Sequence, residues 1–118
     1  MVTPEKINVH DGKVCLVTGS SRGIGKTIAK GFAEARCKIV INCLSNAEVA
    51  LQTMKEIKLE YPNCEVMMVK ADVSLESEVS NMIEQIIGKF GTIDILVSNA
   101  GINVDSVIWK MTKDEWDR

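Results

Sequence analysis

Short apolar runs alternate along this chain with longer segments in which apolar residues recur every three or four positions. The runs at residues 14–17, 38–43, 65–70 and 93–97 have the length of strands. Their nearly continuous apolar character is typical of strands buried on both faces of a sheet. The segments that separate the runs have the period of amphipathic helices. The pattern therefore predicts strands and helices in strict alternation.

Local signals mark the ends of the predicted helices. Ile24 opens the apolar stripe of the first helix. Ser45 is the predicted N-cap of the second helix because Glu48 completes a capping box, and Pro62 ends that helix. Ser74 is the predicted N-cap of the third helix, which a glycine at position 91 terminates.

Strict alternation of strands and helices determines how the strands pair. Each helix returns the chain to the same edge, so neighbouring strands run parallel, and right-handed crossovers favour an α/β, doubly wound, Rossmann-type sheet. The predicted strand order is 3-2-1-4, in which the chain reverses direction between the first and fourth strands. We expect a ligand above the carboxyl ends of these two strands, where Ser98, Asn99, Ala100 and Gly101 lie.

A glycine-rich segment joins the first predicted strand to the first helix. This glycine turn consists of Thr18, Gly19, Ser20, Ser21, Arg22, Gly23, Ile24 and Gly25. A helix that starts here directs its unpaired N–H groups and the positive end of its dipole at any group above the strand. The missing side chains at Gly19, Gly23 and Gly25 let a diphosphate and the neighbouring strand approach closely. The turn therefore predicts a dinucleotide site.

The end of the second strand indicates which dinucleotide is bound. An NAD site usually has Asp or Glu there to accept hydrogen bonds from the ribose 2′-hydroxyl. This chain instead has Asn42, Cys43 and Ser45, with no acid before Glu48. Arg22 supplies a guanidinium that matches a 2′-phosphate, although it can also be read as a solvated loop residue. These features favour NADP over NAD.

Composition and charge exclude several classes of partner. The chain has 118 residues, of which 46% are hydrophobic and 25% charged, as expected for one globular unit. A net charge of -2 without charged blocks indicates neither nucleic-acid nor membrane binding. No apolar stretch approaches the roughly 20 residues of a membrane span, and the N-terminus lacks a signal-peptide pattern. We therefore expect a cytoplasmic protein.

The cysteines and the histidine do not form a predicted reactive site. The four cysteines are too irregularly spaced for a metal site or a redox pair, and we expect structural thiols. They are Cys15, Cys37, Cys43 and Cys64. His10 precedes the first strand and is expected at the surface.

Three motifs together resemble the short-chain dehydrogenase/reductase family. They are Thr18-Gly19-x-x-x-Gly23-Ile24-Gly25, Asp72-Val73 and Asn99-Ala100-Gly101, in that family's order and at its usual spacing. The resemblance runs from about Asp11 to Arg118. The sequence around Ser20, Ser21 and Arg22 and the stretch from Gly101 to Trp116 are most similar to 3-oxoacyl-(acyl carrier protein) reductases, although sugar and polyol reductases of the family look similar here.

The resemblance implies a role for each matching position. The segment from Gly19 to Gly25 would hold the pyrophosphate. Asp72 would accept a hydrogen bond from the adenine amino group, and the Val73 N–H would meet the ring; without the family, Asp72 reads as a turn or capping carboxylate. The riboses would lie along Asn99, Ala100 and Gly101, while Asp94 would support the fold.

The resemblance also implies the activity and partners of an intact protein. Hydride would pass between NADP(H) and a carbonyl or alcohol, with a small-molecule or acyl-carrier-linked substrate, in a homo-oligomer. Family catalysis needs a Tyr-x-x-x-Lys pair, but Tyr61 is followed by Pro62 and has Glu65 four positions on. We therefore name no catalytic residue.

Arg36 departs from the family pattern, and the end of the sequence has the pattern of a helix start. Arg36 stands where a helix C-terminus favours a left-handed glycine, at a cost of roughly 1 kcal/mol. Thr112 and Glu115 form a capping box, so a further helix is expected to begin just before Arg118. The chain therefore reads as the N-terminal, cofactor-binding part of one domain.

Two other classes of function remain open on the sequence. The chain could be a non-catalytic nucleotide-binding or interaction module, whose strand at residues 93–97 would offer an unpaired apolar edge to another chain. It could also be another Rossmann-like binder, such as a methyltransferase. Arg22 and the Asn99-Ala100-Gly101 segment argue against the methyltransferase reading.

Overall fold

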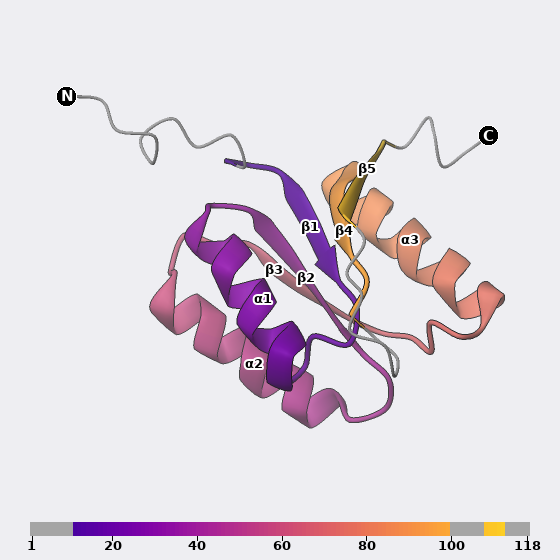
Figure 1. Ribbon diagram of the computed structural model, residues 1–118, viewed down its shortest axis with the longest axis horizontal. Helices are drawn as coiled ribbons and strands as arrows, with labels where there is room; N and C mark the ends of the chain where they lie inside the picture. The colour runs from indigo at the N-terminus through magenta and orange to yellow at the C-terminus, as the bar shows by residue number, and fades with distance from the viewer. Residues whose placement is uncertain (1–10, 100–107, 113–118) are drawn as a thin grey trace.

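The computed structural model describes residues 11–99 and 108–112, which form one five-stranded sheet and three helices. The strands are β1 (Val14–Val17), β2 (Lys38–Cys43), β3 (Val66–Lys70), β4 (Thr92–Val97) and β5 (Ile108–Thr112). The helices are α1 (Gly23–Glu34), α2 (Ala47–Glu60) and α3 (Glu76–Phe90). The strand order is β3-β2-β1-β4-β5, so the predicted order 3-2-1-4 is confirmed (Figure 1).

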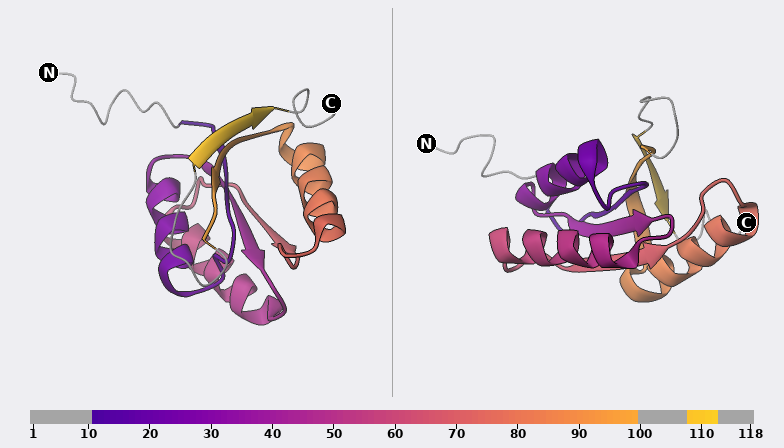
Figure 2. Two further views of the ribbon diagram at one scale, coloured as in Figure 1. Left: turned by 45° about the vertical axis from the view of Figure 1, so that its right-hand side comes forward. Right: turned by 90° about the horizontal axis from the view of Figure 1, so that it is seen from below.

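The helices cover both faces of the sheet, as a doubly wound fold requires. Helices α1 and α2 lie on one face and α3 lies on the other (Figure 2). In β1, Cys15 and Val17 pack into the core beneath α1 and α2, whereas Val14 and Leu16 pack toward α3. Both faces of β1 are therefore buried, which explains why polar residues do not alternate with apolar ones in this strand.

Strand β1 occupies the centre of the parallel sheet. Leu16 is paired with Val40 of β2 on one side and with Leu96 of β4 on the other. At the amino end of β1, the Val14 N–H donates to Oδ2 of Asp94 over 2.9 Å. Asp94 therefore joins β4 to β1, in agreement with its expected structural role.

The predicted N-caps of the second and third helices were each wrong by one residue. The N-cap of α2 is Asn46, whose Oδ1 accepts from the Val49 N–H over 3.2 Å, and Ser45 lies exposed before it. The N-cap of α3 is Leu75, which has no polar side chain. Ser74 is not the cap because its N–H and hydroxyl both donate to Oδ1 of Asp72, at 2.9 and 2.6 Å.

The C-termini of α1 and α3 agree with the sequence. Gly91 ends α3 with a left-handed φ of 82°. Arg36 follows α1 with a φ of 69°, the left-handed position that normally takes glycine. There the Arg36 N–H donates to Ala33 O and the Cys37 N–H to Phe32 O, each over 3.0 Å.

Strand β5 changes two expectations about the end of the chain. It pairs antiparallel with β4, so the edge of residues 93–97 is covered rather than open. Thr112 is the last residue of β5, paired with Thr92, so it belongs to a strand at the place where a helix cap was predicted. The remainder of that predicted helix lies outside the described residues.

One apolar residue lies outside the core that it was expected to join. Ile24 is 60% exposed and is not among the buried residues of α1. The core-facing positions of α1 are instead Ala29 and Ala33, with Ile28 and Phe32 packed beside them.

The thiols lie in the core, and the described part of the chain offers no metal site. The four cysteines are buried and form no disulfide. Residues 11–99 and 108–112 contain no cluster of histidine, cysteine or acidic side chains that could hold a metal ion. None of the described helices is long and apolar enough to cross a membrane. His10 lies outside the described residues.

Candidate functional site

The glycine turn lies at the carboxyl end of β1, where it passes between the ends of β2 and β4 (Figure 1). Gly19 has a φ of 61° and Gly23 a φ of 66°, which residues with a side chain rarely adopt. A Cβ added to Gly25 would lie 2.6 Å from Nδ2 of Asn99 and 2.9 Å from Cα of Ser20. The sequence therefore needs glycine here for backbone shape and for close packing of α1 on the turn.

Ser20 holds the turn to β2 with both its backbone and its side chain. The Ser20 N–H donates to Asn42 O over 3.0 Å, and the Asn42 N–H donates to Oγ of Ser20 over 3.0 Å. The Ser20 side chain is completely buried. Its hydroxyl is thus part of the link between the turn and β2 and points away from solvent.

Asn42 extends this link to the end of β3. Its Oδ1 accepts from the Gly19 N–H over 3.0 Å. Its Nδ2 donates to Ala71 O over 3.2 Å and to Val69 O over 3.4 Å. Asn42 is 2% exposed, so the amide is a structural group at the floor of the site. These bonds explain how a polar residue can lie in the buried part of β2, since a buried amide must find partners.

Asn99 joins the turn to the end of β4 on its other side. The Asn99 N–H donates to Oγ1 of Thr18 over 2.9 Å, and its Nδ2 donates to Gly19 O over 3.3 Å. The Thr18 N–H also donates to Val97 O over 3.0 Å. The predicted meeting of the glycine turn with the segment after β4 is therefore observed at Asn99. Ala100 and Gly101 lie outside the described residues.

The outer side of the turn is open to solvent. Arg22 and Gly23 are exposed, and Ser21 is half-buried. Arg22 is the N-cap of α1. Its backbone is extended, and its side chain makes no capping hydrogen bond to the helix. The first turn of α1 contains no acidic residue. An anion would therefore meet a cation and unpaired N–H groups here.

The residues after β2 divide between core and surface. Cys43 packs into the core beneath α1 and α2, and burial raises the pKa of its thiol. Ser45 is exposed. Leu44, between them, is 63% exposed, an apolar side chain at the rim of the site that the sequence analysis did not select. In this segment the side chains of Leu44 and Ser45 are therefore open to solvent and that of Cys43 is not.

Asp72 and Val73 follow β3 and also divide between two roles. Oδ1 of Asp72 accepts from the hydroxyl and the N–H of Ser74, and these bonds lower the pKa of the carboxyl. The Asp72 N–H donates to Oε1 of Glu78 over 2.8 Å. Val73 packs beside the core under α3. The turn-carboxylate reading of Asp72 thus has direct support, since this carboxyl shapes the start of α3.

Two threonines at the site were given no role from the sequence: Thr18, which was named only as the first residue of the glycine turn, and Thr53. Thr18 bonds to both Val97 and Asn99, and Thr53 on α2 donates through Oγ1 to Ser21 O. Thr53 is 2% exposed. The available signal was a threonine on the apolar face of a predicted helix, since a buried hydroxyl needs a partner nearby.

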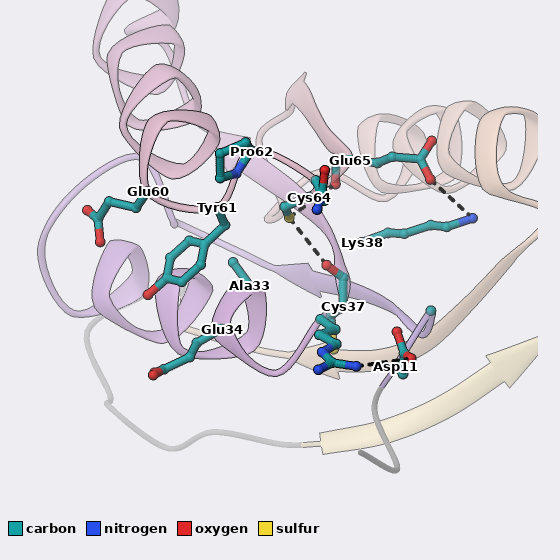
Figure 3. Close-up of a pocket in the computed structure, with 13 residues that line it drawn as sticks. Asp11, Ala33, Glu34, Cys37, Lys38, Glu60, Tyr61, Pro62, Cys64 and Glu65 are labelled. Carbon is teal, nitrogen blue, oxygen red and sulfur yellow. Dashed lines mark hydrogen bonds and ion pairs between the residues drawn. The ribbon is translucent and has the colours of Figure 1, made fainter. Parts of the chain in front are cut away.

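A cavity of about 520 Å³ is lined by Gly12, Cys37 and Glu65, which precede β1, β2 and β3, so it lies at the opposite end of the sheet from the glycine turn (the cavity is drawn in Figure 3). It opens between the C-terminal ends of α1 and α2 and contains the thiols of Cys37 and Cys64. The two cations of its lining are paired, Arg36 with Asp11 at 3.8 Å and Lys38 with Glu65 at 3.5 Å. Because it lies at the amino ends of the strands, the cavity is separate from the site at the glycine turn.

Comparison with known proteins agrees with this architecture. The family model for short chain dehydrogenase matches residues 13–118. A 3-oxoacyl-(acyl-carrier-protein) reductase of Staphylococcus epidermidis is 38% identical over 105 residues, which is 89% of this chain and 42% of that protein. The corresponding reductase of Staphylococcus aureus gives the same identity and coverage. The chain thus spans less than half the length of these curated relatives.

Solved structures give the same result at the level of the fold. A crystal structure of L-sorbose reductase from Gluconobacter frateurii, complexed with NADPH and L-sorbose, matches with a TM-score of 0.75 and 35% identity, over 80% of this chain and 35% of that one. A short-chain dehydrogenase/reductase from Serratia marcescens matches with a TM-score of 0.73 and 31% identity, over 79% of this chain and 37% of that one. With its parallel sheet, glycine turn and family match over 106 residues (13–118), this chain belongs to the short-chain dehydrogenase family.

Proposed function

We propose that this chain binds NADP(H) and serves an oxidoreductase that transfers hydride between that cofactor and a carbonyl or alcohol. The observation that carries the proposal is the exposed Arg22 at the glycine turn, combined with an end of β2 that lacks a carboxylate. Asn42, one residue before the end of β2, is neutral and already bonded to the turn and to Val69 of β3. A 2′-phosphate at this rim would meet one guanidinium and no adjacent acid from β2.

The conformation of the glycine turn supports a dinucleotide at this site. The packing at Gly25 and the positive φ of Gly19 and Gly23 form a turn that a side chain would fill or distort. We propose that the N–H groups from Gly19 to Gly25 hold the pyrophosphate. Ser20 contributes to this group through the shape that its buried hydroxyl imposes on the turn.

The remaining predicted contacts are distributed around the same end of the sheet. We propose that Asp72 and the Val73 N–H meet the adenine, with the free side of the carboxylate accepting from the amino group. We propose that Cys43 supports the ribose site by packing beneath it, and that the exposed hydroxyl of Ser45 lies beside the ribose. Asn99, with Ala100 and Gly101, would line the riboses.

The chemistry of the reaction belongs to the nicotinamide, which supplies or accepts the hydride when bound. The task of this chain is to bind and orient the cofactor at the carboxyl edge of the sheet. We assign no catalytic residue among residues 1–118. The described fold is proposed as the cofactor-binding part of a single domain, in line with its coverage of 42% of its curated relatives.

The substrate class and assembly are proposed from the relatives. The 3-oxoacyl-(acyl-carrier-protein) reductases at 38% identity support a 3-oxoacyl thioester or a similar carbonyl compound. The similarity to L-sorbose reductase, at 35% identity, makes a sugar ketone a second candidate substrate. We propose a homo-oligomer for the intact protein and the cytoplasm as its location.

The alternative of a non-catalytic interaction module loses the feature that supported it. That reading relied on an open edge at residues 93–97, and β5 pairs with this edge. A nucleotide-binding module without activity of its own remains compatible with the glycine turn, and cofactor titration together with a turnover assay separates it from the enzyme.

The decisive experiment compares NADPH and NADH binding by fluorescence titration at one salt concentration. We expect tighter NADPH binding, and Arg22→Ala should weaken it by about 10- to 100-fold while leaving NADH affinity nearly unchanged. Arg36→Ala is the control, since it removes an arginine at the opposite end of the sheet. Equal affinities of the two cofactors for the unaltered chain would refute the role of Arg22 in 2′-phosphate recognition.

A further inference from the structure

Beside the apolar residues that α2 packs into the core shared with α1, three of its polar side chains contact the glycine turn or α1. These are Thr53, Glu56 and Glu60, which lie at helical spacing. Each contacts the turn or α1: Thr53 bonds to Ser21 O, Glu56 pairs with Lys26 and Lys30, and Glu60 pairs with Lys30. Helix α2 therefore holds the turn and the helix that follows it by specific bonds, in addition to packing.

The contact of Thr53 is the one that reaches the turn itself. Its Oγ1 donates to Ser21 O, and the side chain is 2% exposed. The hydroxyl of a threonine inside a helix can also donate to the backbone carbonyl four residues earlier. Thr53 donates to Ser21 O, outside its own helix. Because the bond links residues 32 positions apart, it fixes the turn relative to α2.

This bond fixes the orientation of the next peptide group. The described part of the chain has no cis peptide, so the Ser21 C=O and the Arg22 N–H point in opposite directions across one rigid plane. With the carbonyl drawn toward α2, the Arg22 N–H points away from α2. That N–H has no hydrogen-bond partner among residues 11–99 and 108–112.

Ion pairs one and two helical turns beyond Thr53 join α2 to α1. Lys30 pairs with Glu60 at 2.7 Å and with Glu56 at 3.7 Å, and Lys26 also pairs with Glu56. These bonds lower the pKa of Glu56 and raise that of Lys30, the largest causes being hydrogen bonds from Lys26 to Glu56 and from Lys30 to Glu60. The Ser21–Arg22 peptide thus lies between two segments that α2 holds in place.

We propose that Thr53 is a positioning residue for the anion-binding side of the glycine turn. Its hydroxyl holds Ser21 O so that the Arg22 N–H and the start of the Arg22 side chain face the phosphates of a bound dinucleotide. The inference rests on the proposed function for its ligand, whereas the geometric effect on the turn exists in the cofactor-free protein. Thr53 makes no contact with the ligand.

The first test is NADPH titration of three variants of the full chain. Thr53→Val keeps the shape of the side chain but removes the hydroxyl, and we expect affinity to fall about threefold to tenfold. Thr53→Ser keeps the hydroxyl and should restore affinity to within about twofold. Ile57→Val is the matched control, because it removes one buried methyl group from the part of α2 that packs into the core, one helical turn beyond Thr53. Its affinity should be that of the unaltered chain.

The second test follows amide hydrogen exchange without cofactor. Thr53→Val should accelerate exchange around Ser21, Arg22 and Gly23, by about threefold to tenfold, and leave the amides of β1 and β2 unchanged. Thr53→Ser should not accelerate it, which separates the hydroxyl from packing. If valine prevents folding, the comparison of Thr53→Ser with Thr53→Ala gives the same contrast.

The outcomes distinguish the two proposals. Unchanged exchange in the turn of Thr53→Val, or equal NADPH affinity of the valine and serine variants, overturns the positioning role. Absence of NADPH and NADH binding by the unaltered chain overturns the proposed function, and the exchange experiment still decides the effect of Thr53 on the turn.

Discussion

At the scale of single residues, the polar side chains of the site serve two different purposes. Ser20 and Asn42 are buried and bond to backbone groups of the turn, β2 and β3. Arg22 is exposed on the outer side of the same turn. The sequence placed all three at the site, but only their burial separates the residues that build the turn from those that are available to a ligand.

Gly25 provides the sharpest test of the turn, with Gly31 on the same helix as control. A Cβ at Gly25 would crowd Ser20 and Asn99, so Gly25→Ala should destabilise the fold by about 1–3 kcal/mol. A Cβ at Gly31 would meet nothing within 4 Å, so Gly31→Ala should stabilise it by about 0.5–1 kcal/mol. Urea unfolding measures both changes. A Gly25→Ala variant as stable as the parent would contradict the close contact between α1 and the turn.

At the scale of the elements, the apolar pattern located every parallel strand and helix, while the helix ends depended on competing hydrogen bonds. Asn46 caps α2 in place of Ser45, and Ser74 bonds to Asp72 instead of capping α3. At α2 two neighbouring polar side chains, Ser45 and Asn46, could supply the cap, whereas at α3 the one polar candidate, Ser74, bonds elsewhere and the N-cap position falls to Leu75. Sequence spacing cannot choose the cap, because the choice depends on which backbone groups lie within reach after the loop has folded.

The end of α1 gives a prediction at this scale. Arg36 occupies the left-handed position of a complete helix-terminating motif, with hydrogen bonds to Ala33 O and, from Cys37, to Phe32 O. Arg36→Gly should therefore stabilise the fold by about 0.5–1 kcal/mol, since relief of the left-handed strain exceeds the entropy cost of glycine. Thermal unfolding measures this as a higher Tm.

The control for this prediction is the preceding residue. Ala35 has an ordinary φ of -80°, so Ala35→Gly gains no relief of strain and should lower the stability. A decrease in Tm for both variants would show that the backbone at Arg36 is not strained.

At the scale of the whole molecule, the parallel sheet brings distant segments together at two ends. The carboxyl end gathers the glycine turn, Asn42 and Asn99. The amino end holds the cavity that Cys37 and Cys64 line. The thiol of Cys64 contacts Cys37 O over 3.3 Å, so two of the cysteines meet across the start of β2 and β3. The expectation of structural, buried thiols is consistent with this packing.

The buried thiols predict a loss of stability at alkaline pH. Burial, with a smaller contribution from Cys64, raises the pKa of Cys37 to about 11 from its ordinary value of 9.0. The unfolded chain therefore releases this proton at lower pH than the folded one, so the free energy of unfolding falls between about pH 9 and pH 11. The loss from Cys37 should be on the order of 2 kcal/mol.

Urea unfolding at a series of pH values checks this expectation. Burial also raises the pKa of Cys15, so part of the decline should persist in a Cys37→Ala variant. That variant should show a shallower decline from pH 9 to pH 11 than the parent. Parallel profiles for the two proteins would show that Cys37 does not ionise on unfolding in this range.

The sequence by itself determined the order of the parallel strands, the glycine turn and the family. These follow from local periodicity, from the handedness of crossovers and from glycine positions, all of which can be read within short windows. The tertiary structure decided the rest: the inward turn of Asn42, the bond from Thr53 to Ser21, the exposure of Ile24 and the pairing of β5 with β4. Each of these depends on which segments, far apart in sequence, come to lie within hydrogen-bond or packing distance. No local pattern contains that information, because partners for a buried polar group exist only once the sheet has formed.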